Sequence, residues 1–259
     1  MHSDISLLPD ERLDKINENL SLIQLKEGLT FGTDAYLLAA FTRSRYGAVG
    51  ADLGSGTGVA AFLCLTKNKL SHMHAFEVQP RFADLIRKNA EINGLSERIT
   101  VHSADIRNAL PKDTGGWLDT VISNPPYMKD GCGLGNQSDC KNIARREVYG
   151  TIDDFCACTA SLLKHGGLFN VVYRPDRLAD LFYAMRKRDL EPKRILLVHA
   201  DPSSPPSLVL VEGKKGASSS LLWARPLIIY EAGTRTYTAD MNTVYETCSM
   251  DFLFERRQK

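Results

Sequence analysis

Short apolar runs alternate with longer amphipathic stretches along most of the chain after residue 48. The apolar runs, each typical of a buried strand, cover residues 49–53, 72–77, 98–102, 118–123, 167–172, 194–199 and 207–212. The stretches with helical character cover residues 58–68, 80–93, 151–164 and 176–189. This alternation predicts an α/β fold in which a doubly wound parallel sheet carries helices on both faces.

The end of the pattern predicts a change in strand direction. The runs at 194–199 and 207–212 are separated by Asp201-Pro202-Ser203-Ser204-Pro205-Pro206, which is too short for a crossover helix. These two strands should therefore pair antiparallel. Together with the five strands before them, they predict a Rossmann-like seven-stranded sheet with a terminal antiparallel hairpin.

Several helix ends carry local signals. Asn93-Gly94 predicts a left-handed cap after the second helix, and His165-Gly166-Gly167 predicts the end of the helix before the fifth strand. Ahead of the first strand, an apolar helix over 35–41 follows Thr33 and Asp34, and we expect one of these two residues to be its N-cap.

Composition is that of an ordinary globular enzyme domain, with 259 residues of which 43% are hydrophobic and 24% charged. No apolar stretch reaches the roughly 18 residues of a membrane span, and the first residues lack the basic and apolar regions of a signal peptide. We therefore expect a cytoplasmic protein without a membrane segment. The six cysteines form no Cys-x-x-Cys pair and have no histidines at zinc-ligand spacing, so no metal site is expected.

A glycine-rich loop follows the first strand of the predicted sheet. Residues 49–53 run into Gly54-Ser55-Gly56-Thr57-Gly58, and a helical stretch begins directly after it. Glycines at every second position let the backbone turn sharply and approach a ligand, while the helix start presents free N–H groups. The loop is therefore typical of a nucleotide-type cofactor site. Val59 stands where the dinucleotide fingerprint requires its last glycine, and the Gly-Lys-Ser/Thr of a phosphate loop is missing.

Two acidic residues follow the next strands of the predicted sheet. Glu77 ends the second strand, about 20 residues beyond the glycines, where a carboxylate can accept both ribose hydroxyls of a nucleotide. Asp105 follows the third strand and is placed to accept a hydrogen bond from an adenine amino group. Each acid taken alone is better explained as a solvated loop residue, but their order after the glycine loop favours a cofactor site.

Asn124-Pro125-Pro126-Tyr127 closes the strand at 118–123 and is the most informative motif of the chain. The Asn124 side-chain oxygen and the Pro125 carbonyl can accept both hydrogens of a planar amino group, which makes its nitrogen available for alkylation. The two prolines stiffen the turn, and the ring of Tyr127 offers a stacking surface for a flat substrate. An ordinary Asn-Pro turn is the alternative for this motif taken alone.

The spacing Asp52-x-Gly54-x-Gly56-x-Gly58 resembles motif I of the class I S-adenosylmethionine (SAM) methyltransferases. Phe-Gly-Thr-Asp-Ala at 31–35, the glycine loop and the Asn-Pro-Pro-Tyr turn, in this order, resemble the bacterial tRNA(Val) adenine N6-methyltransferases. The resemblance implies the class I methyltransferase fold, SAM as cofactor and a tRNA as substrate. It also implies that the cofactor contacts Thr33 and Asp34 besides Asp52, Gly54, Ser55, Gly56, Thr57, Gly58, Glu77 and Asp105.

Basic residues after the Asn-Pro-Pro-Tyr turn are candidate contacts to substrate phosphates. Arg145 and Arg146 lie closest to the proposed chemistry, and Arg174 is a further candidate. A glycine-rich lid is expected over 128–149. A formal net charge of only +1 excludes binding of nucleic acid through overall charge alone.

Two alternative functions stay open at this point. A glutamine side-chain amide fits the same two acceptors as adenine, so a protein glutamine N5-methyltransferase is one alternative. A non-catalytic module that binds SAM and RNA is the other. The predicted division of the chain is an N-terminal extension over 1–48 that packs near the cofactor site, a methyltransferase domain over 49–230 and a C-terminal tail over 231–259. An extension of this length is too short for the recognition domain that glutamine methyltransferases carry.

Overall fold

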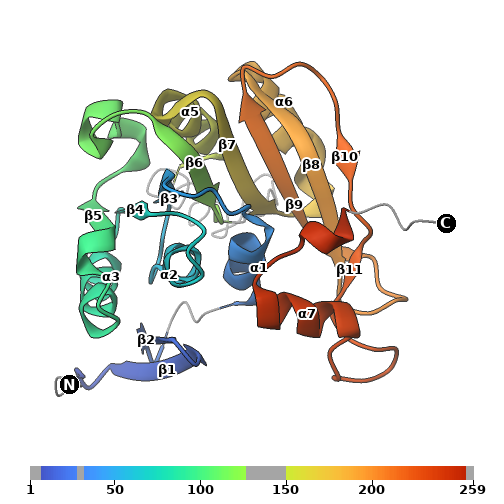
Figure 1. Ribbon diagram of the computed structural model, residues 1–259, viewed down its shortest axis with the longest axis horizontal. Helices are drawn as coiled ribbons and strands as arrows, with labels where there is room; N and C mark the ends of the chain where they lie inside the picture. Colours follow the sequence, from blue (N-terminus) through green and yellow to red (C-terminus); the bar gives the residue numbers. More distant parts are fainter. Residues whose placement is uncertain (1–6, 28–31, 127–149, 255–259) are drawn as a thin grey trace, which may run out of the picture.

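A nine-stranded sheet forms the centre of the computed structural model, which describes residues 7–27, 32–126 and 150–254 (Figure 1). The predicted lid over 128–149 and the candidate site residues Tyr127, Arg145 and Arg146 lie outside the described residues. From one edge to the other the strands are β10 (Leu222–Trp223), β8 (Leu190–His199), β9 (Pro206–Lys215), β7 (Leu163–Tyr173), β6 (Leu118–Ser123), β3 (Val49–Leu53), β4 (His72–Glu77) and β5 (Ile99–Ser103), with β11 (Leu227–Ile228) also on β8.

Strand directions confirm the predicted α/β architecture. Strands β7, β6, β3, β4 and β5 pair parallel, whereas β9 pairs antiparallel with both of its neighbours, β7 and β8. The expected terminal hairpin is therefore present, and its second strand lies between the first strand and the rest of the sheet. The strand count exceeds the predicted seven because β10 and β11, two residues each, pair parallel with the outer side of β8.

Helices cover both faces of the sheet (Figure 1). One hydrophobic layer contains buried side chains of α1, α2, α3 and α7, and the other contains those of α5 and α6. Neighbouring residues of one strand point into opposite layers, as Val121 and Ile122 of β6 do. The helices are α1 (Thr33–Phe41), α2 (Val59–Thr66), α3 (Pro80–Ile92), α5 (Ile152–Leu162), α6 (Leu178–Lys187) and α7 (Ala239–Thr247), besides the 3-10 helices η1 (Ser96–Arg98), η2 (Ile106–Asn108), η3 (Pro111–Thr114), η4 (Pro175–Arg177) and η5 (Asp251–Leu253).

A separate two-stranded sheet, which the hydrophobic pattern did not predict, precedes α1. Its strands are β1 (Glu11–Asn17) and β2 (Leu20–Leu25), and β2 packs against α3. At the other end of the chain, Met241 and Val244 of α7 are fully buried beside α1. The division of the chain at residues 48 and 230 stays a prediction.

Two helix ends differ from the sequence-based expectation. Helix α5 ends at Leu162 and β7 begins at Leu163, two residues before His165-Gly166-Gly167. The register between β6 and β7 shifts over this segment, and Gly166 there has a φ of +75°. The glycines therefore accommodate an irregularity within the strand. Gly32 is the N-cap of α1, so neither Thr33 nor Asp34 is the cap. The left-handed Gly94 after α3, with a φ of +64°, confirms the predicted cap at that helix end.

Candidate functional site

The candidate residues that follow β6, β3, β4 and β5 lie along one edge of the sheet. These strands are adjacent and parallel, with Leu53 paired to both Ser123 and Phe76, and Glu77 paired to Ser103. Their carboxyl ends therefore meet at one edge, which is the usual position of ligand sites in open α/β sheets. The Asn124 turn, the glycine loop, Glu77 and Asp105 follow in that order along this edge.

The glycine loop is held by its own backbone and by β4. The N–H groups of Gly54 and Ser55 both donate to the carbonyl of Phe76, at 3.0 Å each, and the Ser55 hydroxyl donates to the Asp52 carbonyl at 2.8 Å. Gly56 and Gly58 have φ values of +56° and +83°, the left-handed region that favours glycine.

Gly56 and Gly58 differ in their surroundings. A methyl group on Gly58 would lie 2.8 Å from the ring of Phe62, so this glycine permits close packing of the loop on α2. A methyl group on Gly56 would meet no atom of the described residues within 4 Å. Gly56 therefore leaves open space at the position where a cofactor would approach the backbone.

The carboxylate of Glu77 is fixed beside this loop. Its Oε2 accepts from the Gly56 N–H and its Oε1 from the Gln79 N–H, both at 2.9 Å, and the residue is buried. Asp52 is also buried, and burial followed by the nearby negative charge of Glu77 raises the pKa of Asp52 to about 7. The cofactor side of the edge therefore holds two carboxyl groups in a region that water hardly reaches.

Asp105 lies at the start of η2, beyond β5. It accepts from the Arg107 N–H at 2.9 Å and forms an ion pair with the guanidinium of the same residue. The hydrogen bond from the Arg107 side chain holds the pKa of Asp105 below its usual range. Asp105 is thus ionised and is oriented by Arg107, at the end of the carboxyl edge farthest from Asn124.

The Asn124 turn lies next to the glycine loop. The buried Ser123 hydroxyl donates to the carbonyl of Leu53 at 2.8 Å, which ties the end of β6 to the last residue before the loop. Asn124 is half-buried, Pro125 is buried and Pro126 is exposed. Two acceptors of the proposed amino-group site therefore start from a fixed strand end.

Helix α1 and the end of β7 add the remaining described candidates. Arg45, four residues after α1, donates to the carbonyl of Asp119 near the amino end of β6. Since the helix ends at that side of the sheet, its first residues, Thr33 and Asp34, lie at the other end of the helix. Arg174 follows β7 on the carboxyl edge and forms an ion pair with Asp176.

Asn89 of α3 is a positioning residue that the sequence analysis missed. Its buried amide accepts from the Ile23 N–H at 2.6 Å and donates to the carbonyls of Ile23 and Thr57 at 3.1 and 3.3 Å. It thereby joins the N-terminal hairpin to the glycine loop. The available signal was an asparagine on the apolar face of an amphipathic helix, in line with Phe82 and Ile86.

The described part of the chain holds neither a membrane-spanning helix nor a cluster of metal-ligating side chains. None of its helices combines the length and the apolar character that crossing a membrane requires. Nor do its histidine, cysteine, aspartate and glutamate side chains form a group of three or more that could bind a metal ion.

Known structures with a similar fold are methyltransferases. A predicted O-methyltransferase from Agrobacterium tumefaciens aligns with a TM-score of 0.67 and 23% identity, over 83% of this chain and 97% of its own. The TYW2 protein of P. horikoshii, solved in complex with MeSAdo, aligns with a TM-score of 0.56 and 13% identity, over 80% of this chain and 72% of its own. At these identities the likeness establishes the fold, which is that of the class I methyltransferases.

Sequence relatives are more specific. The model of the methyltransferase small domain matches residues 26–177. A Bacteroides fragilis protein named tRNA1(Val) (adenine(37)-N6)-methyltransferase is 30% identical over 186 residues, which are 72% of this chain and 77% of the relative. A Porphyromonas gingivalis protein of the same name is 28% identical, over 70% of this chain and 72% of the relative. The chain therefore belongs to the methyltransferase small domain family.

Proposed function

We propose that this protein transfers the methyl group of SAM to the exocyclic N6 nitrogen of an adenine in a tRNA. The placement of the Asn124 turn directly beside the glycine loop carries this proposal, since it sets acceptors for an amino group next to a cofactor loop. The names of the family's relatives, which are tRNA adenine N6-methyltransferases, support the same reaction. We expect the protein to act in the cytoplasm, where its tRNA substrate is found.

The residues at the cofactor side fit SAM. Open space in front of Gly56 allows a ligand to contact the loop backbone, and the neighbouring Glu77 carboxylate is an acceptor suited to ribose hydroxyls. We assign Gly54 to Gly58, with Asp52, to the methionine and ribose part, and Asp105 to the adenine. Thr33 and Asp34, at the start of α1, border the methionine end in this assignment.

When bound, SAM supplies an electrophilic methyl group on a sulfonium centre. The chain supplies position and hydrogen-bond acceptors. The Asn124 side-chain oxygen and the Pro125 carbonyl accept the two N6 hydrogens, which draws the nitrogen lone pair out of conjugation with the ring. Tyr127 stacks on the adenine, which must be unpaired or flipped out to reach the site. Arg145, Arg146 and Arg174 contact phosphates of the same RNA in this proposal.

A strong general base is not required for this reaction. The attacking amine becomes acidic once it carries the methyl group, so its proton is lost to water after transfer. Most of the acceleration then comes from orientation of the amino group toward the methyl donor. The proposed mechanism therefore requires hydrogen-bond acceptors at the amino group and no titrating histidine or carboxylate.

Incubation with isotope-labelled SAM tests the reaction. The protein is mixed in parallel with bulk tRNA and with bulk protein, and the labelled products are digested to nucleosides or amino acids. Label in N6-methyladenosine alone is the expected result. Label in protein glutamine would replace the proposal with glutamine N5-methylation, and binding of SAM without any labelled product would replace it with a non-catalytic module.

The variant Asn124→Ala tests the assigned acceptor. Loss of one preorganised polar contact should lower turnover by about 100-fold or more, while SAM affinity stays unchanged. Asn242→Ala is the matched control, because Asn242 is exposed on α7 and outside the site. Full turnover in Asn124→Ala would refute the role of this side chain.

A further inference from the structure

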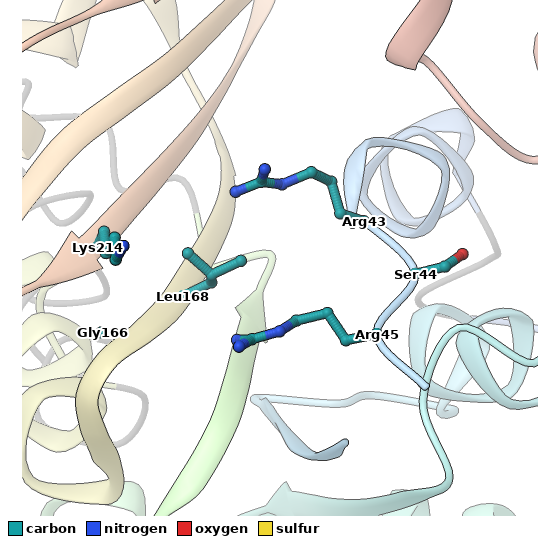
Figure 2. A pocket seen from close by; sticks show the side chains of 6 residues that line it. All are labelled: Arg43, Ser44, Arg45, Gly166, Leu168 and Lys214. Atoms are coloured by element: carbon teal, nitrogen blue, oxygen red, sulfur yellow. The ribbon is translucent and has the colours of Figure 1, made fainter. Parts of the chain in front are cut away.

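A basic pocket lies at the edge of the sheet opposite to the candidate site. Its volume is about 240 Å³, and it is lined by Arg43, Ser44, Arg45, Gly166, Leu168 and Lys214. Figure 2 shows the guanidinium groups of Arg43 and Arg45 extending from one turn toward the strands that carry Leu168 and Lys214. Three cationic side chains from two distant segments of the sequence therefore converge on one depression.

Much of the hydrogen-bonding capacity of these cations is unused within the described residues. The Arg45 guanidinium donates through Nη1 to the Asp119 carbonyl at 3.1 Å, and the exposed Lys214 ammonium group has no hydrogen bond or ion pair with a described residue. Arg43 binds the buried Glu212 through Nε and Nη2, at 2.9 and 2.7 Å, which leaves its Nη1 available.

Positive charge exceeds negative charge around the pocket. Four cationic side chains, Arg43, Arg45, Lys164 and Lys214, lie near two carboxylates, Glu212 and Asp119, which pair with Arg43 and Lys164. Arg194 also contacts Glu212, but Asp251 balances its charge. The remaining excess of positive charge and the free N–H groups suit a phosphate group.

Two exposed aromatic residues flank the same edge. Tyr46 follows Arg45 and is fully exposed, and Trp117 is 69% exposed. Trp117 lies two residues before Asp119, whose carbonyl accepts from Arg45 and whose side chain accepts from the Val49 N–H at 2.9 Å. Arg45 therefore links the pocket to the segments that carry both rings.

We infer that this edge is a second RNA-binding surface, in which the pocket binds a backbone phosphate and Tyr46 and Trp117 stack on unpaired bases. Cationic grooves bordered by aromatic rings bind single-stranded nucleic acid through these two contacts. The inference rests on the proposed function for its ligand, because a tRNA bound at the carboxyl edge is the polyanion available.

One tRNA is long enough to contact both edges. The strand β3 that connects them has five residues, which at about 3.3 Å per residue span roughly 16 Å. A folded RNA of several helical turns exceeds this length. Contacts at the edge that carries the pocket, where the parallel strands begin, would hold the substrate without touching the adenine that is methylated.

Binding of a valine tRNA transcript, measured by fluorescence anisotropy at several salt concentrations, tests the surface. Lys214→Ala should weaken binding and lower the slope of log affinity against log salt by about 0.7 to 0.9, as expected for one lost phosphate contact. Trp117→Ala should weaken binding by about 5- to 150-fold without a change in slope, as expected for one lost base stack. Lys187→Ala, on α6 at the opposite face, is the matched control.

The outcomes of this experiment distinguish failure of the second RNA-binding surface from failure of the proposed function. Unchanged SAM affinity in the variants shows that they are folded. If the native protein methylates the transcript but both variants bind it as Lys187→Ala does, the second surface is refuted and the proposed function stands. If the native protein does not methylate the transcript while the variants lose affinity as expected, the proposed function fails and the surface stands. Concentration-dependent dimers that Trp117→Ala abolishes, with unchanged RNA affinity, would show that a second copy of the chain covers this edge.

Discussion

Substitution of Gly56 by alanine separates cofactor binding from folding at the glycine loop. Gly56 has a φ of +56°, and an L residue in this region costs about 1 to 2 kcal/mol. No clash adds to this cost, because no described atom lies within 4 Å of the new methyl group. Gly56→Ala should therefore fold with a free energy of unfolding lower by about 1 to 2 kcal/mol. Its methyl group fills the space assigned to SAM, so SAM affinity should fall at least tenfold, or by about 1.4 kcal/mol.

Gly233 and Gly58 provide the comparisons for this variant. Gly233, between β11 and α7, has a φ of +68° and the same open surroundings, so Gly233→Ala should lose a similar amount of stability with normal SAM affinity. Gly58 has a φ of +83°, and its methyl group would lie 2.8 Å from Phe62 and 3.3 Å from Ile86. Overpacking of about 1 to 3 kcal/mol adds to the backbone cost there, so Gly58→Ala should lose about 2 to 5 kcal/mol in total.

Urea unfolding gives the stabilities of these variants, and calorimetric titration with SAM gives their affinities. We expect Gly56→Ala to lose both stability and SAM affinity, and Gly233→Ala to lose stability alone. Equal SAM affinity of Gly56→Ala and Gly233→Ala would show that the loop does not hold the cofactor at Gly56. A stability loss in Gly56→Ala as large as in Gly58→Ala would show that the space in front of Gly56 is filled by protein atoms.

Three further predictions concern buried polar groups. The pKa of Asp52 rises from 3.8 to about 7 in the folded protein, so its contribution to stability is complete below about pH 4 and is lost as the pH rises toward 7. Between these pH values the free energy of unfolding should fall by up to about 4 kcal/mol more in the native protein than in Asp52→Asn. Urea titrations at several pH values measure this difference. Lys69 is buried, and its Nζ donates to three carbonyls at the end of α1. Lys69→Met should therefore lower the free energy of unfolding by about 3 kcal/mol or more. A loss below about 1 kcal/mol in urea unfolding would mean that water replaces these hydrogen bonds. Asn89→Leu should lower SAM affinity as well as stability, because the hairpin and the glycine loop lose their connection; normal affinity in calorimetric titration would contradict this positioning role.

The amino-acid sequence by itself determined the order of the strands β3 to β9 and of the helices between them, and it proposed the residues of the candidate site. Local signals were sufficient where the cause is local, as in the left-handed Gly94 after α3 and the alternation of apolar and amphipathic stretches. The candidate residues after β6, β3, β4 and β5 could be grouped from the sequence because parallel strands bring their carboxyl ends to one edge, where motifs far apart in the sequence follow successive strand ends. The family resemblance named the cofactor and the substrate class.

Only the tertiary structure decided the features that depend on distant partners. Strands β10 and β11 have two residues each and exist because the outer side of β8 offers unpaired backbone groups. The start of β7 at Leu163 follows from pairing with Leu118, although the sequence suggested a helix end at the glycines. The role of Asn89 and the convergence of Arg43, Arg45 and Lys214 were hidden for the same physical reason, because a pocket or a buried hydrogen bond between segments far apart has no periodicity along the chain.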